Sequence, residues 1–553
     1  MYIDRCVTKR DGNEYVRYLL RESFRENGRV KKRTIANLSE CKKEEIEAMM
    51  LALKHKEDLT QLGVTKNSVQ VIQGVSIGAV WVVHQVAKEL GIIDALGKDR
   101  DGKLALWQVI ARIIDQGSRL SASRLANAHA CAEVVGVSGF NEDSLYYNLD
   151  WIAEQQTCIE DNLFKKYYSN SKPSLYLYDV TSSYFEGWHN ELAAFGYNRD
   201  GKKGKKQIVV GLVCDEKGEP FSIQVFKGNT PDLNTFEEQV KKVKERFGAS
   251  NVTFVGDRGM IKAEQIKQLS VAGYYYITAI TKPQIESLLK SDLLQMSLFD
   301  EHVAEILDKE ETRYILRRNP IRAQEIRASR ASKLATITTK VNEANTYLEQ
   351  HSRASAEKAQ QRIQKHAERL KLRWVSIKLS SRNLTLAEDK TLLVETEKLD
   401  GCYVIKSNLP QVKADKDVIH ARYKDLAFVE QAFRTSKTNH LELRPIFLRL
   451  AERTKAHALV VMLAYKIIRK LREAWQHLNL TVQEGISELS SLCLETIIIN
   501  RETSYNSIPT PRDSIKQLLH ALNITLPSVL PLAPNKRVST NVKLQNRRNQ
   551  QKN

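Results

Sequence analysis

The segment Leu175–Gly187 reads LYLYDVTSSYFEG and places one acid, Asp179, inside an apolar run. Short runs rich in aromatic and β-branched residues are typical of buried strands, so we expect a strand here. An isolated buried carboxylate is costly and is normally neutralised, paired with a cation or bound to a metal. Taken alone, Asp179 therefore fits a structural ion pair as well as a functional site.

A second acid follows another apolar run. The sequence NVTFVG at 251–256 predicts a strand that leads directly into Asp257 and Arg258. The segments between the two acids alternate in type, with two β runs joined by Lys217-Gly218 and then an amphipathic helix. This alternation predicts that both acids belong to one sheet flanked by helices.

The third acid stands in the segment YKDLAFVEQAFRTSKTNH, residues 423–440, which contains no Gly or Pro and predicts one helix. Tyr423, Glu430 and Lys437 recur every seven residues, so they share one helical stripe. Arg434 lies one turn from Glu430, and this pair alone is worth only about 0.2–0.5 kcal/mol. The segment is therefore compatible with simple salt bridging until it is considered with the other two acids.

Two aspartates at strand positions and a glutamate on a later helix supply what a two-metal phosphoryl transfer site requires. Hard carboxylate oxygens hold two Mg²⁺ ions about 3.5–4 Å apart in such sites. Lys and Arg side chains beside the third acid are suited to holding phosphates, and Arg offers bidentate contacts. The three acids together favour a metal site over three unrelated ion pairs.

The charge balance indicates a polyanionic partner. The chain has 85 Lys and Arg against 66 Asp and Glu, a net charge of +19 and a pI near 9.4. Nucleic acid is the leading candidate, since no run of about 18 apolar residues predicts a membrane span. The N-terminus lacks the features of a secretory signal, and the seven cysteines show no CxxC or zinc-ligand spacing, so we expect a cytoplasmic, reduced protein.

The rest of the pattern predicts a chain of several segments. Residues 117–130 fit either the second half of a helix-turn-helix or an ordinary bundle. Strands are also expected at 374–379, 391–396 and 401–406, returning the chain to the sheet. The expected segments are a basic β-hairpin turning at Glu26-Asn27-Gly28 plus a helix (1–60), a helical domain (61–170), the first part of the core (171–281), a basic helical insertion (282–372), the second part of the core (373–479), a helical cap (480–532) and a disordered basic tail (533–553).

Five motifs in a fixed order carry a resemblance to a known family. They are YDVTSSYFEG, GYNRDGKKGKKQIVVGLVCDEKGEPFSIQVFKGNTPD, VGDRGM, LDGCYVIKSNL and YKDLAFVEQAFRTSKTNHLELRPIF. In this order they resemble the DDE transposases of bacterial insertion sequences, in the group with a Tyr-Arg-Glu-Lys signature. The resemblance covers most of the chain.

The resemblance implies a fold and a site. The fold is α+β, a ribonuclease H-like mixed sheet flanked by helices, with an N-terminal hairpin and helical domain and a helical insertion before the third acid. Leu426 stands where the signature has Arg, so Arg434 is expected to make that phosphate contact. The implied catalytic and metal-binding residues are Asp179, Asp257 and Glu430, which hold two Mg²⁺ ions that Mn²⁺ replaces, and the implied DNA-binding residues are Tyr423, Arg434, Lys437 and Arg258.

The implied activity is metal-dependent cleavage at the ends of an insertion sequence, followed by transfer of the freed 3′-OH into target DNA. The partner is double-stranded DNA in the bacterial nucleoid, with a homodimer pairing two ends and no membrane. Two alternatives remain. One is an inactive, transposase-derived DNA-binding regulator, in which the acids are structural ion pairs, and the other is a ribonuclease H-like nuclease without strand transfer.

Overall fold

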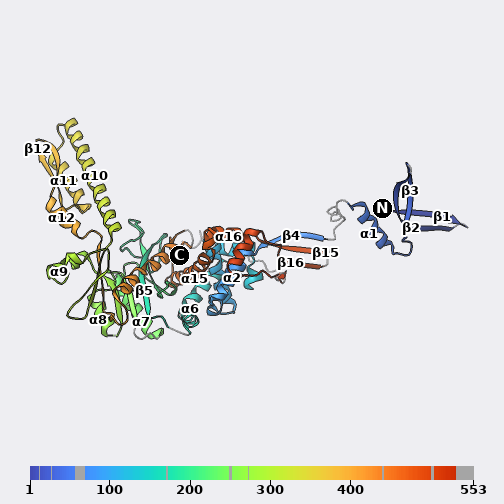
Figure 1. Ribbon diagram of the computed structural model, residues 1–553, viewed down its shortest axis with the longest axis horizontal. Coiled ribbons are helices and arrows are strands. Elements are labelled where there is room, and N and C mark those ends of the chain that lie inside the picture. Colours follow the sequence, from blue (N-terminus) through green and yellow to red (C-terminus); the bar gives the residue numbers. More distant parts are fainter. Residues whose placement is uncertain are drawn as a thin grey trace, which may run out of the picture. The chain divides into compact units, whose positions relative to one another are not determined.

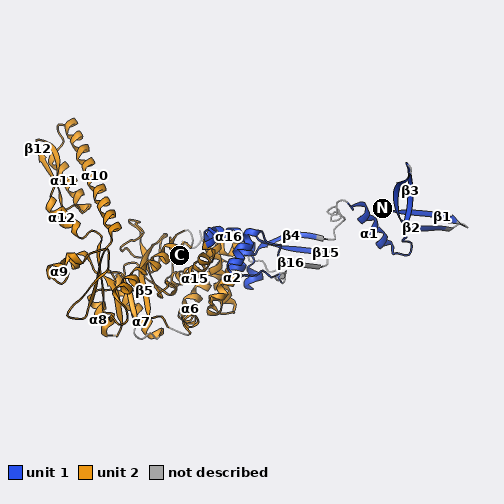
Figure 2. Ribbon diagram, in the orientation of Figure 1, with its two compact units in different colours: residues 1–82, 126–139, 477–538 blue, residues 83–125, 140–476, 539–553 orange. Residues whose placement is uncertain are grey.

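The fold is taken from a computed structural model of the chain. The structure describes residues 1–10, 13–26, 28–56, 69–169, 172–247, 252–271, 273–438, 441–499, 503–527 and 529–530. The chain divides into two compact units, one formed by residues 1–82, 126–139 and 477–538 and the other by residues 83–125, 140–476 and 539–553 (Figure 2). Each unit is described by itself.

The second unit is built on an eight-stranded mixed sheet in the order β10-β11-β14-β9-β8-β5-β6-β7. Strand β5 of this sheet is labelled in Figure 1. Strand β5 pairs antiparallel with β6, and β6 with β7, whereas β5, β8 and β9 run parallel. The outer strands β14, β11 and β10 continue the sheet in antiparallel pairs. The strands are β5 (Leu175–Tyr184), β6 (Gln207–Cys214), β7 (Pro220–Lys227), β8 (Thr253–Gly256), β9 (Tyr275–Ala279), β10 (Ala304–Leu307), β11 (Arg313–Arg318) and β14 (Cys402–Ser407).

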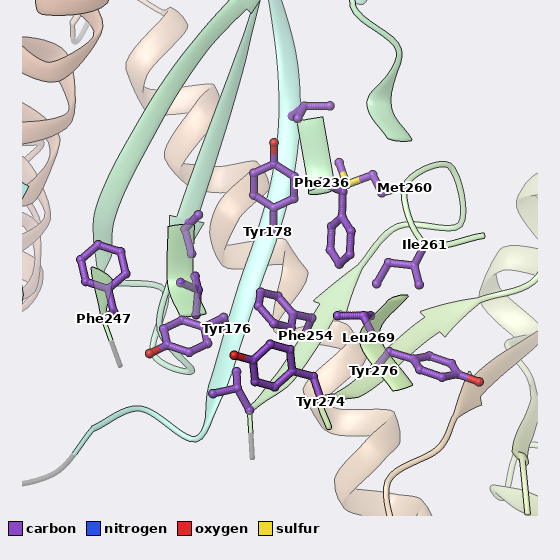
Figure 3. Packing of buried hydrophobic residues seen from close by; sticks show 14 of the residues in the cluster. Tyr176, Tyr178, Phe236, Phe247, Phe254, Met260, Ile261, Leu269, Tyr274 and Tyr276 are labelled. Atoms are coloured by element: carbon purple, nitrogen blue, oxygen red, sulfur yellow. The ribbon is translucent and has the colours of Figure 1, made fainter. Parts of the chain in front are cut away.

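Aromatic side chains fill one side of this sheet (Figure 3). Tyr176 and Tyr178 of β5 lie against Phe221, Phe236 and Phe254, with ring centroids 5.3–6.0 Å apart. Every residue of β5 is buried except Asp179 and Tyr184, which are half-buried. A strand buried on both faces reads as a continuous apolar run, which is why the segment around Asp179 could be predicted as a strand.

Helices cover the sheet. Helix α15 packs on α4, α6 and β7, so these helices belong to the same compact unit as the sheet. The guanidinium of Arg119, at the start of α5, is buried 3.1 Å from Nδ1 of His457 on α15, so the first turn of α5 packs into the protein. The helices are α3 (Ile92–Leu96), α4 (Arg100–Ile114), α5 (Arg119–Ala128), α6 (Glu142–Tyr167), α7 (Asp232–Arg246), α8 (Ala263–Val271), α9 (Lys282–Lys290), α13 (Lys416–Lys424), α14 (Leu426–Lys437) and α15 (Ala451–Trp475), and a 3-10 turn η3 spans Met296–Leu298.

Residues 320–398 form an arm with a hydrophobic core of its own, in which Ile337, Ile363 and Trp374 are buried. Its elements are α10 (Pro320–Gln350), α11 (Ala356–Arg369), β12 (Val375–Ser380), β13 (Asn383–Glu388) and α12 (Lys390–Lys398). Strand β12 pairs with β13 in a separate two-stranded sheet, so it does not return the chain to the main sheet as expected.

Two sequence predictions in this region are wrong. Segments 304–307 and 313–318 are strands β10 and β11 of the main sheet, although a helical insertion was expected over 282–372. These strands are short, and the polar sequence around them hides their apolar residues. The strand expected at 391–396 lies inside helix α12, because the Asp389 side chain accepts hydrogen bonds from the backbone N–H groups of Thr391 and Leu392 and caps a helix there.

The first unit contains two further sheets. The N-terminal sheet has the order β1-β2-β3, so the expected hairpin is present as β2 and β3, with β1 as a third strand, and Asn27 of its turn lies outside the described residues. The other sheet joins β4 to β15, far apart in sequence, so the segment 480–532 contains more strand than the expected helical cap. The expected disordered tail at 533–553 lies outside the described residues. The elements are β1 (Tyr2–Arg10), β2 (Asn13–Glu26), β3 (Arg29–Asn37), α1 (Lys43–Lys54), β4 (Val69–Ser76), α2 (Gly78–Glu89), η2 (Cys131–Val135), η4 (Gln476–Leu478), α16 (Val482–Ser490), β15 (Cys493–Ile499), β16 (Thr503–Ser507), α17 (Asp513–Ala521) and β17 (Val529–Leu530).

Candidate active site

Asp179 and Asp257 are brought level by the register of two parallel strands. Strand β5 pairs with β8 so that Leu177 lies opposite Val255, and each aspartate comes two residues later in its own strand direction. Strand β8 ends at Gly256, and Asp257 opens the turn that follows, where its carbonyl accepts a hydrogen bond from the Met260 N–H at 2.9 Å. The two carboxylates therefore meet at the same edge of the sheet.

Glu430 reaches this edge from helix α14, which packs against β5. Val429, Ala432 and Phe433 form the buried face of α14, and Glu430 is exposed beside that face. The single helix expected over 423–440 is divided, because α13 ends at Lys424 and α14 begins at Leu426. Tyr423 thus lies on a different helix from Glu430.

All three acids line one cleft of about 540 Å³. The middle of β5, the turn after β8, the loop before β6 and helix α14 contribute its walls, so the cleft assembles residues far apart in the chain. The lining residues are Asp179, Val180, Thr181, Arg199, Asp200, Asp232, Asp257, Met260, Glu430, Phe433, Arg434, Lys437 and Arg444.

The electrostatics of Asp179 reflect this crowding. The pKa of Asp179 is raised to about 7, chiefly by burial and also by the negative charges of Asp257 and Glu430, while the hydrogen bond from the Val180 N–H and the charge of Arg199 oppose the shift. The Oδ1 atoms of Asp179 and Asp257 accept backbone N–H groups, at 2.8 and 2.7 Å. Among the ion pairs of the described residues, none within 4.0 Å involves Asp179, Asp257 or Glu430.

This donor set fits a hard divalent cation in its chemistry. Carboxylate oxygens are the ligands that Mg²⁺ prefers, and three acids that share a cleft without a neutralising cation leave their negative charge to be compensated from outside. Within the described part of the chain, however, no three His, Cys, Asp or Glu side chains are already arranged as a metal-holding group.

Tyr423 and Arg258 lie close enough to the acids to interact with them electrostatically. Burial raises the pKa of the Tyr423 hydroxyl, the charge of Asp257 raises it further, and the charge of Arg258 opposes this. Arg258 is exposed in the turn after Asp257. Arg434 is exposed on α14 and lines the cleft.

Lys437 differs from the other expected DNA-binding residues, because it is buried and already paired. Its Nζ lies 2.9 Å from Oδ1 of Asp200, and the two side chains are 8% and 2% exposed. Arg444 contacts the same Oδ1 at 2.5 Å, and the Tyr184 N–H donates to Oδ2 at 3.1 Å. Burial lowers the pKa of Lys437, although its bond to Asp200 opposes the shift.

The sequence reasoning missed Asp200 and the second charged pair of the cleft, Arg199 with Asp232, whose atoms lie 2.7 Å apart. Asp200 and Arg199 belong to the Gly- and Lys-rich loop at 196–207, where no periodicity marks a side chain for burial. Asp200 and Asp232 are two of five acids in the lysine-containing segment at 196–232, so nothing in the sequence distinguished them.

Comparisons with known proteins agree with this geometry. Residues 170–467, which include the two aspartates and the helical glutamate, match the family model of the transposase DDE domain. Residues 4–66 match the N-terminal domain of IS1634 family transposases. Because the first match covers more than half of the 553 residues, the chain belongs to the DDE transposases of insertion sequences.

Further comparisons add little. No curated protein matches the chain. Among solved structures, a cryo-EM structure of a piggyBac transposase synaptic complex with hairpin DNA is 9% identical, covers 71% of this chain and 70% of its own, and gives a TM-score of 0.38. A similarity this weak carries no argument here. Among the described residues, no helix is long and apolar enough to cross a membrane.

Proposed function

We propose that this transposase cuts DNA at the ends of its insertion sequence and joins the freed 3′-OH to target DNA, with Asp179, Asp257 and Glu430 as the catalytic carboxylates. The observation that carries the proposal is the shared cleft, in which these three acids meet without any paired cation. Structural ion pairs, as in the regulator alternative, leave no such uncompensated group of acids.

The strand order supports a ribonuclease H-like core. An antiparallel meander β5-β6-β7 is followed by β8 and β9, which lie parallel to β5 on its other side. This arrangement places the end of β8 beside the middle of β5, so the first two acids of the proposed triad come from adjacent strands. The third acid comes from the helix packed against β5.

The chain's own residues have distinct roles in this proposal. Asp179, Asp257 and Glu430 would hold two Mg²⁺ ions, or Mn²⁺ in their place, and these ions, when bound, activate the attacking oxygen and stabilise the leaving one. The Asp179 carboxylate must lose its proton to bind a cation, and its raised pKa makes this step dependent on pH.

The DNA contacts of the cleft form the next part of the proposal. Arg434 and Arg258 are exposed cations that would hold phosphates of the scissile strand, and the half-buried Tyr423 would position that strand beside the acids. Lys437 belongs to the same set, but its bond to Asp200 gives it a second role in fixing the loop at 196–207.

The arrangement of segments and partners completes the proposal. We place recognition of the element end in residues 61–170, additional DNA contacts in the basic segment 1–60, the arm at 320–398 and the segment 533–553, and the catalytic core in the segments 171–318 and 399–479, followed by the segment 480–532. The reaction brings two ends together, so the active form would be a homodimer acting on DNA in the bacterial nucleoid.

The test uses purified full-length protein and linear duplexes that carry the element's own ends with flanking DNA. With Mg²⁺, we expect a cut that exposes a 3′-OH at the element end, and no cut with EDTA. A second duplex with a pre-cut end should be joined to a supercoiled plasmid. Cutting without joining would favour the nuclease alternative, and specific binding without either reaction would favour the regulator.

A further inference from the structure

Helix α11 of the arm presents a row of cations on one face. The row has spacings of four, three and four residues, which place its members on a single helical stripe about 16 Å long. All are exposed. The members, which we call the α11 stripe, are Lys358, Arg362, Lys365 and Arg369.

The opposite face of α11 fixes the direction of this stripe. Ile363 and Ala367 are buried in the arm's core. Nε2 of Gln360 donates to the carbonyl of Ile377 at 2.7 Å, and Oε1 of Gln364 accepts from the Ile377 N–H at 3.0 Å, so α11 is hydrogen-bonded to strand β12. With the apolar face used in this packing, the stripe points to solvent.

The spacing of the stripe lowers the stability of helix α11. Lys358 and Arg362, and likewise Lys365 and Arg369, are like charges four residues apart, which destabilise a helix. Some exposed cations of the chain are paired with an acid three residues away, as in Arg322–Glu325 at 2.6 Å. Among the described residues of the arm, the ion pairs involve Arg322 and Arg330, and none includes a stripe side chain.

We propose that the α11 stripe binds the phosphate backbone of duplex DNA outside the catalytic cleft. A regular row of unpaired cations matches a polyanion, and duplex DNA carries one negative charge per about 1.7 Å of its axis. An acidic membrane surface fits less well, because surface-bound helices also insert an apolar face, and that face of α11 is already buried. The inference rests on the proposed function, which supplies the DNA.

The experiment measures binding of a fluorescent duplex of about forty base pairs, carrying the element end and its flank, at several salt concentrations in EDTA. The variant Arg362→Gln/Lys365→Gln removes two cations from the stripe. Since each phosphate contact contributes about 0.9 to the slope of log K against log salt, we expect the slope to fall by about two and affinity near 0.15 M salt to fall by about tenfold to thirtyfold.

The matched control is Arg322→Gln/Lys516→Gln, which removes two cations that are already paired with acids three residues away. We expect its slope to change by less than half as much. The other half of the stripe, Lys358→Gln/Arg369→Gln, provides a second test if the first variant loses its circular dichroism signal. Equal slopes for wild type, stripe variants and control would overturn the inference. A parallel titration with duplex RNA gives a second check, because a loss seen only with RNA would also overturn it.

The binding assay contains no divalent metal, so it does not depend on catalysis. Wild-type protein that fails to bind duplex DNA at all would overturn the proposed function. Wild-type protein that binds, with stripe variants that bind equally well at every salt concentration, would overturn only the role of α11.

Discussion

Two charged regions of the second unit differ in whether their charged groups already have partners. In the cleft, the half-buried Asp179 and the exposed Asp257 and Glu430 have no cation within ion-pair distance. In a second pocket, of about 590 Å³, Glu219 contacts Lys466 and Arg469 of α15, and the Tyr168 hydroxyl donates to Asp215 at 2.8 Å. We call this second region the α15 pocket.

Paired charges of the α15 pocket have a structural role, which distinguishes them from the unpaired charges of the cleft. Lys466 of the α15 pocket is 1% exposed, contacts Glu219, donates to the carbonyl of Pro220 at 2.9 Å and lies 4.5 Å from the ring centre of Tyr167. A cation this fully satisfied has no capacity left for a ligand. The carboxylates of the cleft have no such partners and keep the capacity to bind a ligand. In these two regions, charged groups therefore indicate function only where partners are missing.

The largest expected effect comes from removing a carboxylate of the cleft. Glu430→Gln should lower the cleavage rate by about a thousandfold, or about 4 kcal/mol of transition-state stabilisation, because a metal ligand is lost. Asp232→Asn is the matched control, since Asp232 lines the same cleft but is paired with Arg199. Its rate in single-turnover cleavage should fall less than tenfold, and equal losses in both variants would remove the distinction between paired and unpaired acids.

The next effect concerns the α15 pocket. Lys466→Met should lower the free energy of unfolding by about 3 kcal/mol, because it leaves the carboxylate of Glu219 partly unpaired in a buried position. Urea denaturation measures this loss, and the double variant Lys466→Met/Glu219→Gln should recover part of it. The cleavage rate of the folded protein should stay unchanged, and a fall comparable to that of Glu430→Gln would place the α15 pocket in the catalytic machinery.

A smaller effect follows from the titration of Asp179. The pKa of Asp179 is raised from 3.8 to about 7 in the folded chain, so between these values the folded chain holds a proton that the unfolded chain releases. Its stabilising contribution is complete below about pH 4 and is lost as the pH rises through about 7. In EDTA, Asp179→Asn should therefore melt a few degrees above wild type at pH 8 and together with it near pH 4.

Added Mg²⁺ provides a second test of Asp179, because a cation that binds only the folded chain stabilises it. At pH 8 it should raise the melting temperature of wild type and leave that of Asp179→Asn unchanged. At pH 6, where protons compete for the carboxylate, wild type should need about tenfold more Mg²⁺ for the same shift. Equal responses of both proteins to Mg²⁺ would remove Asp179 from the metal site.

The smallest effect is expected at the rim of the cleft. Arg434→Gln should weaken binding of element-end DNA by about 1 kcal/mol and lower the salt slope by about one, because Arg434 is exposed and would contact a single phosphate. The salt dependence of binding in EDTA measures both quantities. Lys437→Gln should instead lower the melting temperature, since it breaks the buried pair with Asp200.

Local pattern predicted the elements that carry the site, but not what brings them together. The apolar runs before Asp179 and Asp257 identify their strands, and the helical period places Glu430 on a helix. The parallel register that sets Leu177 opposite Val255 is a tertiary property, and no local pattern contains it. The pairing of Asp200 with Lys437 joins residues far apart in the chain, so it too was invisible in the sequence.

Capping and composition explain the remaining differences. The end of α13 at Lys424 was missed because the segment contains no Gly or Pro to mark a break. Helix α12 was mistaken for a strand because its β-prone residues outweighed the Asp389 cap in the pattern. Strand β11 was missed because its apolar residues are few and stand between charged ones. Its first residue, Arg313, is a buried cation whose guanidinium donates to the carbonyls of Leu409 and Ala414, and no local pattern predicts this burial.

The most direct test of the central claim is to locate Mn²⁺ by anomalous diffraction in crystals of the protein bound to a pre-cut element end. The account predicts two peaks about 3.5–4 Å apart, in contact with the carboxylates of Asp179, Asp257 and Glu430. Crystals whose protein still cuts DNA, but whose Mn²⁺ lies away from these three side chains, would contradict it.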